Sequence, residues 1–290
     1  MTAALRSPGG PGRVGGRVSG AVRGAVRDPR IVIGALLTLV VVALAVLGPY
    51  VAPYGEYDIV GRPFTGDGSL FGTDYLGQDV LSRLLHGGRA ILLTALLATA
   101  LSMVVGVTYG VLAAYLGGWT DEILMRANDV LLAFPQILVA LLVLAAVKDP
   151  GPWVIVAFVA LAYAPRVARV ARGVALPYVD QDFVQAAEAV GERRWRIVLT
   201  ELGPNLTVPL LAEAGLRLTY AIGLIAGISF LGFATNPGAA DWGQMTNENR
   251  LGLLVQPWGV LAPVLVLALF TIGTNLLAEA VGARAAKGDS

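Results

Sequence analysis

The longest uncharged stretch of the chain, AILLTALLATALSMVVGVTYGVLAAYLGGWT, covers residues 90–120 between Arg89 and Asp121. The hydrocarbon core of a bilayer is about 30 Å thick, and roughly 20 apolar residues in a helix cross it. Residues 90–120 exceed that length, so they predict a membrane-spanning helix.

The composition of the whole chain agrees with this prediction. Of the 290 residues, 56% are hydrophobic and 14% are charged, whereas a soluble domain carries about 25% charged residues. So few charges do not cover a water-facing surface, which excludes an ordinary soluble globule. The chain has no cysteine, which excludes disulfides and thiolate metal sites. A formal net charge of +1 gives no indication of a nucleic-acid partner.

Further long apolar stretches lie on either side of residues 90–120. They are residues 31–50, residues 130–147, a stretch from 153 past Pro165, residues 206–233 and a stretch within 251–278. The sequence therefore predicts an all-α, polytopic membrane protein with six transmembrane helices. Residues 31–50 have a longer apolar run than a signal peptide and no small-residue cleavage site follows them, so we expect an uncleaved anchor.

Basic residues predict the orientation. With six spans both termini lie on one side, and most of the 21 basic residues fall there, in residues 1–30, at Arg126, in residues 166–202 and in the tail. The other side would carry Arg62, Arg83, Arg89, Lys148 and Arg250. Because the side richer in Lys and Arg is cytoplasmic, both termini are expected in the cytoplasm.

The predicted domain organisation follows from these assignments. Residues 1–30 form an Arg/Gly-rich leader without apolar periodicity, expected to be disordered. The first helix covers residues 31–50, an external loop covers 51–89, a five-helix membrane domain covers 90–280, and a cytoplasmic tail covers 281–290.

A cytoplasmic stretch between the fourth and fifth spans, residues 173–205, is longer than a simple turn requires. It predicts a short helix at about 180–191, with Asp180 or Asp182 capping its start and Gly191 ending it. A second helix, 192 to about 202, is expected to stop before Pro204. The short helix has one apolar face, made of Phe183, Ala186, Ala187 and Val190. Spacing alone allows this face to enter a groove on another protein or to lie on the membrane surface.

Several motifs in this order resemble a known family. Gln185-Ala186-Ala187, then Gly191, then Pro204-Asn205 is similar to the cytoplasmic "EAA" signature of permease subunits of bacterial ATP-binding-cassette (ABC) importers. Segments at 71–74, 76–83, 117–135, 229–232 and 242–243 resemble the dipeptide, oligopeptide and nickel permeases of the "C" subunit type. The resemblance covers about residues 30–280. Two positions depart from the signature, because Gln185 replaces Glu and Gly203 replaces the Leu before Pro.

The resemblance implies a type I ABC importer permease fold, in which a cytoplasmic coupling helix enters a groove on an ATPase subunit. It places this joint at Asp182, Phe183, Gln185, Ala186, Ala187 and Gly191. The permease itself is then a non-catalytic subunit that binds no cofactor, with ATP and Mg on the partner ATPase subunits. The chain agrees, since it has no G-x-x-x-x-G-K-[ST] loop.

The resemblance also implies partners. They are a second, paralogous permease, two ATPase subunits or domains, an extracytoplasmic binding (lipo)protein and the lipid of a bacterial inner membrane. External residues 51–89 and 234–256 are candidates to contact the binding protein. Di- or oligopeptides are the expected substrate, with nickel and glutathione as alternatives that the motifs do not separate.

Glu213 and Arg217 are four residues apart inside the fifth predicted span. A charge at the bilayer centre costs about 2.5 to 3.5 kcal/mol on insertion scales, so two such charges are expected to pair or to face water. They are candidates for the translocation path, and a structural pair buried against a neighbouring helix is an equal alternative.

Other residues carry weaker signals. His86 is the only histidine and lacks catalytic or metal-binding neighbours in the sequence, and Arg166, Arg169 and Arg172 are expected to contact lipid phosphates or a neighbouring loop. Gly106-x-x-x-Gly110 and Gly223-x-x-x-Gly227 allow close helix approach.

An intramembrane protease is disfavoured because its motifs are missing. A passive channel is disfavoured because it needs no docking helix.

Overall fold

The computed structural model describes residues 28–66, 69–147, 150–233 and 238–288. The described chain is all-helical, apart from two isolated bridges. Of its helices, five are long and apolar enough to cross a membrane, or six if one bent pair counts as a span. The expected leader lies almost wholly outside the described residues.

Four long helices match predicted spans. They are α2 (Pro29–Val51), α4 (Gly88–Leu116), α7 (Pro152–Val179) and α10 (Gly203–Phe230). The sixth span, predicted within residues 251–278, forms as α12 (Trp258–Gly288). α3 (Val80–His86) precedes α4 directly, so helical structure begins inside the stretch expected to be an external loop. Asp79 starts α3 by accepting a hydrogen bond from the Ser82 amide at 2.7 Å.

The third span differs from the prediction of one helix at 130–147. The structure has α5 (Gly118–Leu132) and α6 (Gln136–Ala146), bent by 79° at the break between them. Pro135 explains the break, because it has no amide hydrogen and disfavours helical geometry at Phe134. α6 has 11 residues, about 16 Å at 1.5 Å per residue, so it cannot cross a bilayer alone.

The helix predicted from 192 to about 202 also differs from its prediction. α9 (Arg194–Arg196) leads through a π-helical segment, η1 (Ile197–Leu202), straight into α10, and residues Arg194–Phe230 form one candidate span. Pro204 does not stop the helix: it is the second residue of α10, directly after the π-helical segment, where the regular α-helical hydrogen bonding is already interrupted.

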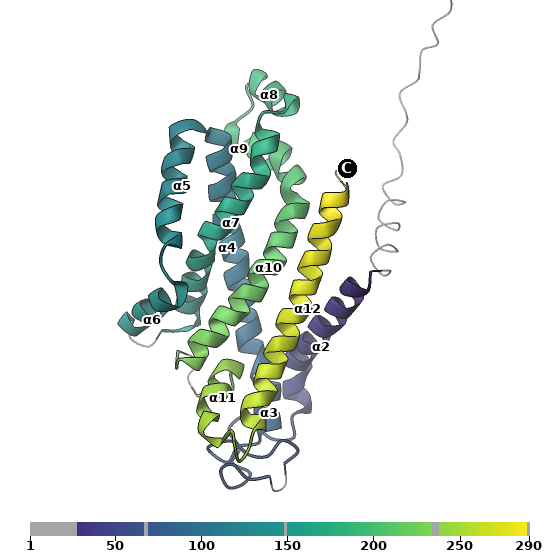
Figure 1. Ribbon diagram of the computed structural model, residues 1–290, viewed down its shortest axis with the longest axis vertical. Coiled ribbons are helices and arrows are strands. Elements are labelled where there is room, and N and C mark those ends of the chain that lie inside the picture. The colour runs from purple at the N-terminus through teal and green to yellow at the C-terminus, as the bar shows by residue number, and fades with distance from the viewer. Residues whose placement is uncertain (1–27, 67–68, 148–149, 234–237, 289–290) are drawn as a thin grey trace, which may run out of the picture.

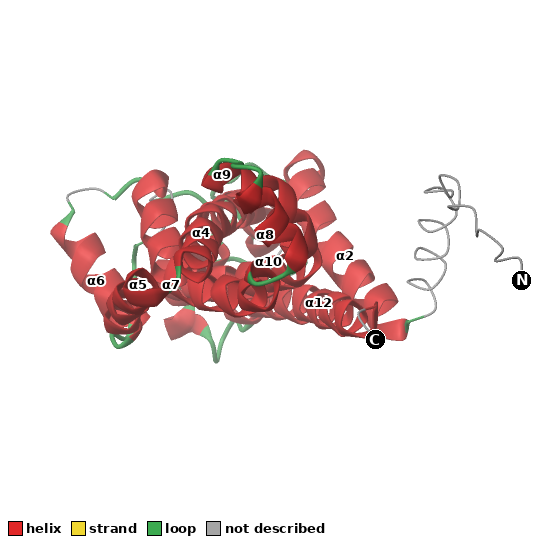
Figure 2. Ribbon diagram, turned by 90° about the horizontal axis from the view of Figure 1, so that it is seen from above, coloured by secondary structure: helices red, strands yellow, loops and turns green. Residues whose placement is uncertain are grey.

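The helices are arranged so that the two ends of the molecule differ. Figure 1 shows α8 (Asp182–Ala189) and α9 at one end, and α3 with α11 (Trp242–Glu248) at the opposite end. Figure 2 shows α5 and α6 at one edge of the bundle and α2 toward the other. α2 packs against α12, and α12 against α10.

The closest packing joins α4 to α7. A Cβ added to Gly106 would lie 2.5 Å from the Cβ of Val167, and one added to Gly110 would overlap the carbonyl oxygen of Ala168. The prediction of close approach at these two glycines is confirmed. It is wrong for Gly223, where an added Cβ meets nothing within 4 Å.

Two hydrophobic clusters fill the bundle. The larger cluster joins α3 and α11 to the membrane helices and includes Ile91, Ile155, Ile225 and Trp242. The smaller cluster lies at the α8 end and includes Val111, Ala171, Val184 and Leu206. α4, α7 and α10 contribute to both clusters and therefore connect the two ends of the molecule.

Candidate functional site

The short helix predicted at about 180–191 forms close to that position, as α8. Its start differs from the prediction, because Gln181 is the capping residue and its side chain makes no hydrogen bond to the first turn of the helix. The backbone carbonyl of Gln181 instead accepts from the amides of Val184 and Gln185. Asp182 lies in the first turn, where its negative charge interacts favourably with the positive end of the helix dipole.

The end of α8 confirms the role predicted for Gly191. This residue has φ +83°, the left-handed region that favours glycine. The Gly191 amide donates to the carbonyl of Glu188 at 2.9 Å, and the Glu192 amide donates to that of Ala187 at 3.1 Å. These two bonds are those of a Schellman motif, which satisfies the last carbonyls of the helix.

The predicted apolar face of α8 is divided between surface and core. Phe183 is 37% exposed, Val190 is 83% exposed, and Ala186 is exposed between them. We call Phe183, Ala186 and Val190 the outer face. Ala187 is half-buried and packs against the smaller cluster beside the fully buried Val184. The sequence pattern missed Val184, which anchors α8 to the membrane helices.

Gln185, which replaces the signature Glu, is exposed on α8. Its side-chain amide donates to the carbonyl of Asp180 at 3.2 Å, just before the helix. The residue therefore stabilises the entry to α8 through a neutral hydrogen bond.

Glu213 and Arg217 form an ion pair within α10, with 2.6 Å between Oε1 of Glu213 and Nε of Arg217. Both side chains are buried, at 7% and 10% exposure. The guanidinium lies 5.9 Å from the ring of Tyr163 in α7 and 5.2 Å from the ring of Tyr220. The Tyr163 hydroxyl donates to the carbonyl of Tyr220 at 2.9 Å, so the pair belongs to a polar contact between α7 and α10.

The three arginines of α7 contact α5 and α6. Arg172 donates twice to Asp121 at 2.5 Å, Arg169 pairs with Asp129 at 2.5 Å, and Arg166 donates to Gln136 at 2.8 Å. The expectation of lipid phosphates or a loop is therefore corrected to neighbouring helices. Sequence reasoning missed Asp121 and Asp129 as partners because they lie more than one span away.

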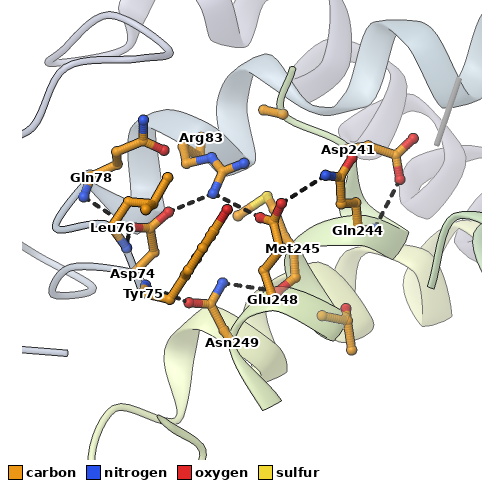
Figure 3. A network of polar contacts seen from close by, with 12 residues as sticks. Asp74, Tyr75, Leu76, Gln78, Arg83, Asp241, Gln244, Met245, Glu248 and Asn249 are labelled. Atoms are coloured by element: carbon orange, nitrogen blue, oxygen red, sulfur yellow. Dashed lines mark hydrogen bonds and ion pairs between the residues drawn. The ribbon is translucent and has the colours of Figure 1, made fainter. Parts of the chain in front are cut away.

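A buried polar network forms at the end opposite α8, and Figure 3 shows its residues. Arg83 of α3 pairs with Asp74 at 2.5 Å and with Glu248 of α11 at 3.0 Å. Asp74 also accepts from the amides of Leu76 and Gln78, both at 2.8 Å. These residues come from the two segments expected to contact a binding protein, 51–89 and 234–256, and their ion pairs and hydrogen bonds join the two segments.

Other polar groups near this network extend it. The Tyr75 amide donates to Asn249 at 3.0 Å, and Gln244 donates to Glu248 at 2.7 Å. Burial, and then the negative charge of Glu248, raise the pKa of the Tyr75 phenol above its ordinary value. Among the described residues, the one hydrogen bond of the His86 side chain is local: its Nδ1 lies 2.8 Å from the carbonyl oxygen of Ser82. No group of three potential metal ligands occurs among the described residues.

Comparisons with known proteins agree with this architecture. Residues 106–287 match the family model of the binding-protein-dependent transport system inner membrane component. A glutathione transport system permease protein, GsiD, of Pectobacterium atrosepticum is 33% identical and covers 86% of this chain and 83% of its own length. A di/tripeptide transport system permease protein, DppC, of Pseudomonas aeruginosa is 31% identical, covering 85% of this chain and 84% of its own length.

A solved structure gives the fold independently. The MetNI methionine ABC transporter, in inward-facing conformations, has a chain that matches with a TM-score of 0.54 at 18% identity, covering 69% of this chain and 96% of that chain. The fold is therefore that of an ABC importer permease. The chain has several helices that can cross a membrane, and the family model matches more than half of its length. The chain therefore belongs to the family of binding-protein-dependent transport system inner membrane components, the non-catalytic permeases of ABC importers.

Proposed function

We propose that this permease forms half of the translocation pathway of an ATP-driven peptide importer, beside a second, paralogous permease. Two ATPase subunits or domains drive it, and an extracytoplasmic binding (lipo)protein delivers the substrate. Relatives named as peptide permeases support the peptide class, among them a putative peptide transport system permease protein of Brucella suis at 35% identity over 85% of this chain. Glutathione is the second candidate because a relative of similar identity is named for it.

The joint with the ATPase is the outer face of α8, together with Asp182, Gln185, Ala187 and Gly191. The observation that carries this proposal is the division of α8 into two faces. Val184 holds the helix to the bundle, while Phe183 and Val190 expose apolar surface with no covering residue among those described. Exposed apolar surface next to small Ala186 suits a groove on another protein. The α8 end of the molecule, with both termini, then faces the cytoplasm.

The Glu213–Arg217 pair acts in the wall of the pathway, where it holds α10 against α7. Its burial between tyrosines supports this role over direct contact with a substrate. Charge reversal distinguishes the two roles, as described below.

The experiment for the proposed function replaces Ala186 by Asp, which puts a charge at the centre of the outer face. The variant should insert into the membrane normally but fail to copurify with the ATPase subunits, because a carboxylate loses its hydration in an apolar groove. Thr120→Asp is the matched control, since it adds a carboxylate in the exposed first turn of α5 at the same end of the molecule. Normal copurification of the Ala186→Asp variant would show that α8 does not form the joint.

Substrate needs a separate measurement, on the binding protein encoded with this permease. Calorimetric titration with alanyl-alanine, a tripeptide and glutathione should show tight binding of the first two. Binding of glutathione alone would replace the peptide proposal by the second candidate.

A further inference from the structure

The inner face of α8 belongs to a hydrophobic cluster that also includes helices far away in the sequence. Val184 is 1% exposed and packs in the smaller cluster, with Val111 and Ala114 from α4 and Ala171 and Ala175 from α7. α7 precedes α8 in the chain and α10 follows it, so both are joined to it covalently as well. α4 is joined to α8 only through side chains.

One polar contact strengthens the connection between α8 and α4. The hydroxyl of Tyr115, near the end of α4, donates to Oε1 of Glu188 in α8 at 2.7 Å, across 73 positions of sequence. Of the side-chain hydrogen bonds in the described ranges, this is the one that joins α8 to another helix. Glu188 is exposed, so water competes for this bond, while the charge on the carboxylate acceptor strengthens it relative to a neutral pair.

The positions of Val184 and Glu188 show how this bond affects the orientation of α8. They are four residues apart, so they lie one turn apart on the same side of α8. Val184 and Ala187 pack side by side near the middle of α8, and a further contact one turn beyond Val184 helps to fix the direction of the helix axis. The Tyr115–Glu188 bond therefore defines the angle between α8 and α4.

α4 carries this constraint through the membrane. It is 29 residues long, packs closely along α7, and reaches the larger cluster at the opposite end through Ile91 and Ala95. A displacement of α8 that α4 follows is therefore delivered to the end that carries α3 and α11.

We propose that Tyr115 and Glu188 are positioning residues for transport, which make α8 and α4 move as one rigid unit when the ATPase subunits bind ATP. This inference rests on the proposed function, because α8 must be the joint at which the ATPase acts. Neither residue belongs to the outer face of α8, which is the proposed contact with the ATPase. Tyr115→Phe therefore leaves affinity for the ATPase subunits unchanged.

The test uses the complete transporter in lipid nanodiscs. Since the chain has no cysteine, spin labels can be placed at Ala189→Cys on α8 and Val104→Cys on α4, both exposed. Pulsed electron resonance then measures the distance between them without nucleotide and after trapping with ATP and vanadate. With Tyr115 and Glu188 intact, the mean distance should be the same in both states. With Tyr115→Phe or Glu188→Ala, it should shift between the states, with a broader distribution.

Three further variants make the result specific. Glu188→Gln keeps an oxygen acceptor and should restore the unshifted distance. Tyr178→Phe is the matched control, because Tyr178 packs in the same cluster and its hydroxyl has no hydrogen bond among the described residues. The double variant Tyr115→Phe/Glu188→Ala should behave like either single variant, since all three lack the same bond.

Two outcomes would overturn the inference: a distance that shifts on trapping in the unsubstituted protein, or a Tyr115→Phe variant that behaves like Tyr178→Phe. These failures are separable from failure of the proposed function. If Ala186→Asp abolishes copurification while Tyr115→Phe has no effect, only the positioning role is wrong. If Ala186→Asp copurifies normally, the joint itself is wrong.

Discussion

The indole nitrogen of Trp242 in α11 donates a hydrogen bond to the backbone carbonyl of Leu84 in α3, 2.9 Å away. Trp242 is fully buried, and the bond spans 158 positions of sequence. It joins α11 to α3, and with the Arg83–Glu248 pair it makes the end opposite α8 one packed unit.

Trp242→Phe should destabilise this end. Phenylalanine keeps part of the buried ring but removes the donor, leaving the Leu84 carbonyl unpaired, which costs about 1 to 3 kcal/mol. Thermal unfolding of the purified protein in detergent measures the loss. Trp119→Phe is the control because Trp119 is 83% exposed. Equal melting temperatures for both variants would contradict the structural role of Trp242.

Gly110→Ala should separate α4 from α7. An added methyl group would overlap the backbone of Ala168, which cannot move as a flexible side chain can. Overpacking of this kind costs about 1 to 3 kcal/mol. Gly223→Ala, placed where nothing lies within 4 Å, should be neutral or stabilising because alanine favours a helix. The prediction fails if Gly110→Ala melts at or above the temperature of Gly223→Ala.

Arg83→Met should be strongly destabilising. Asp74 is 0% exposed and loses its cation in this variant, while Glu248 loses the same partner. Breaking a buried pair from one side costs about 3 to 5 kcal/mol. Removing one of the two orphaned charges should recover part of the loss, so Arg83→Met/Glu248→Gln should melt above Arg83→Met. A double variant that melts no higher would argue against a shared network.

Exchange of the charges of Glu213 and Arg217 tests the role of the pair. Arg217→Ala alone leaves a buried carboxylate unpaired and should lower stability by about 3 to 5 kcal/mol. Glu213→Arg/Arg217→Glu restores an i,i+4 pair and should recover part of that stability. Transport by the exchanged variant should keep the substrate preference of the unsubstituted protein in a competition assay with charged and neutral peptides. A changed preference would mean that the pair contacts the substrate.

The sequence was a good guide wherever one physical signal dominates. Length of the apolar run located α2, α4, α7, α10 and α12, since nothing else satisfies a bilayer of fixed thickness. Gly191 was predictable as a helix end because a positive φ favours one residue type. At α5 and α6 the apolar run gave a misleading answer, since one proline bends the chain while leaving its hydropathy unchanged.

Contacts between residues distant in the sequence could not be predicted from the sequence alone. Arg166, Arg169 and Arg172 were visible as a basic stripe, but their partners on α5 and α6 follow from how two helices cross. Val184, Tyr115 and Glu188 were not singled out at all, because a lone valine, tyrosine or glutamate has no local signature.

The sequence by itself determined that the chain crosses a membrane repeatedly and that a short helix follows α7, because hydrophobic length and turn chemistry are local properties. Only the tertiary structure decided which side of that helix is buried and which charges pair. Burial and ion pairing depend on atoms brought together from distant parts of the chain, and their energies exist only once the helices have packed.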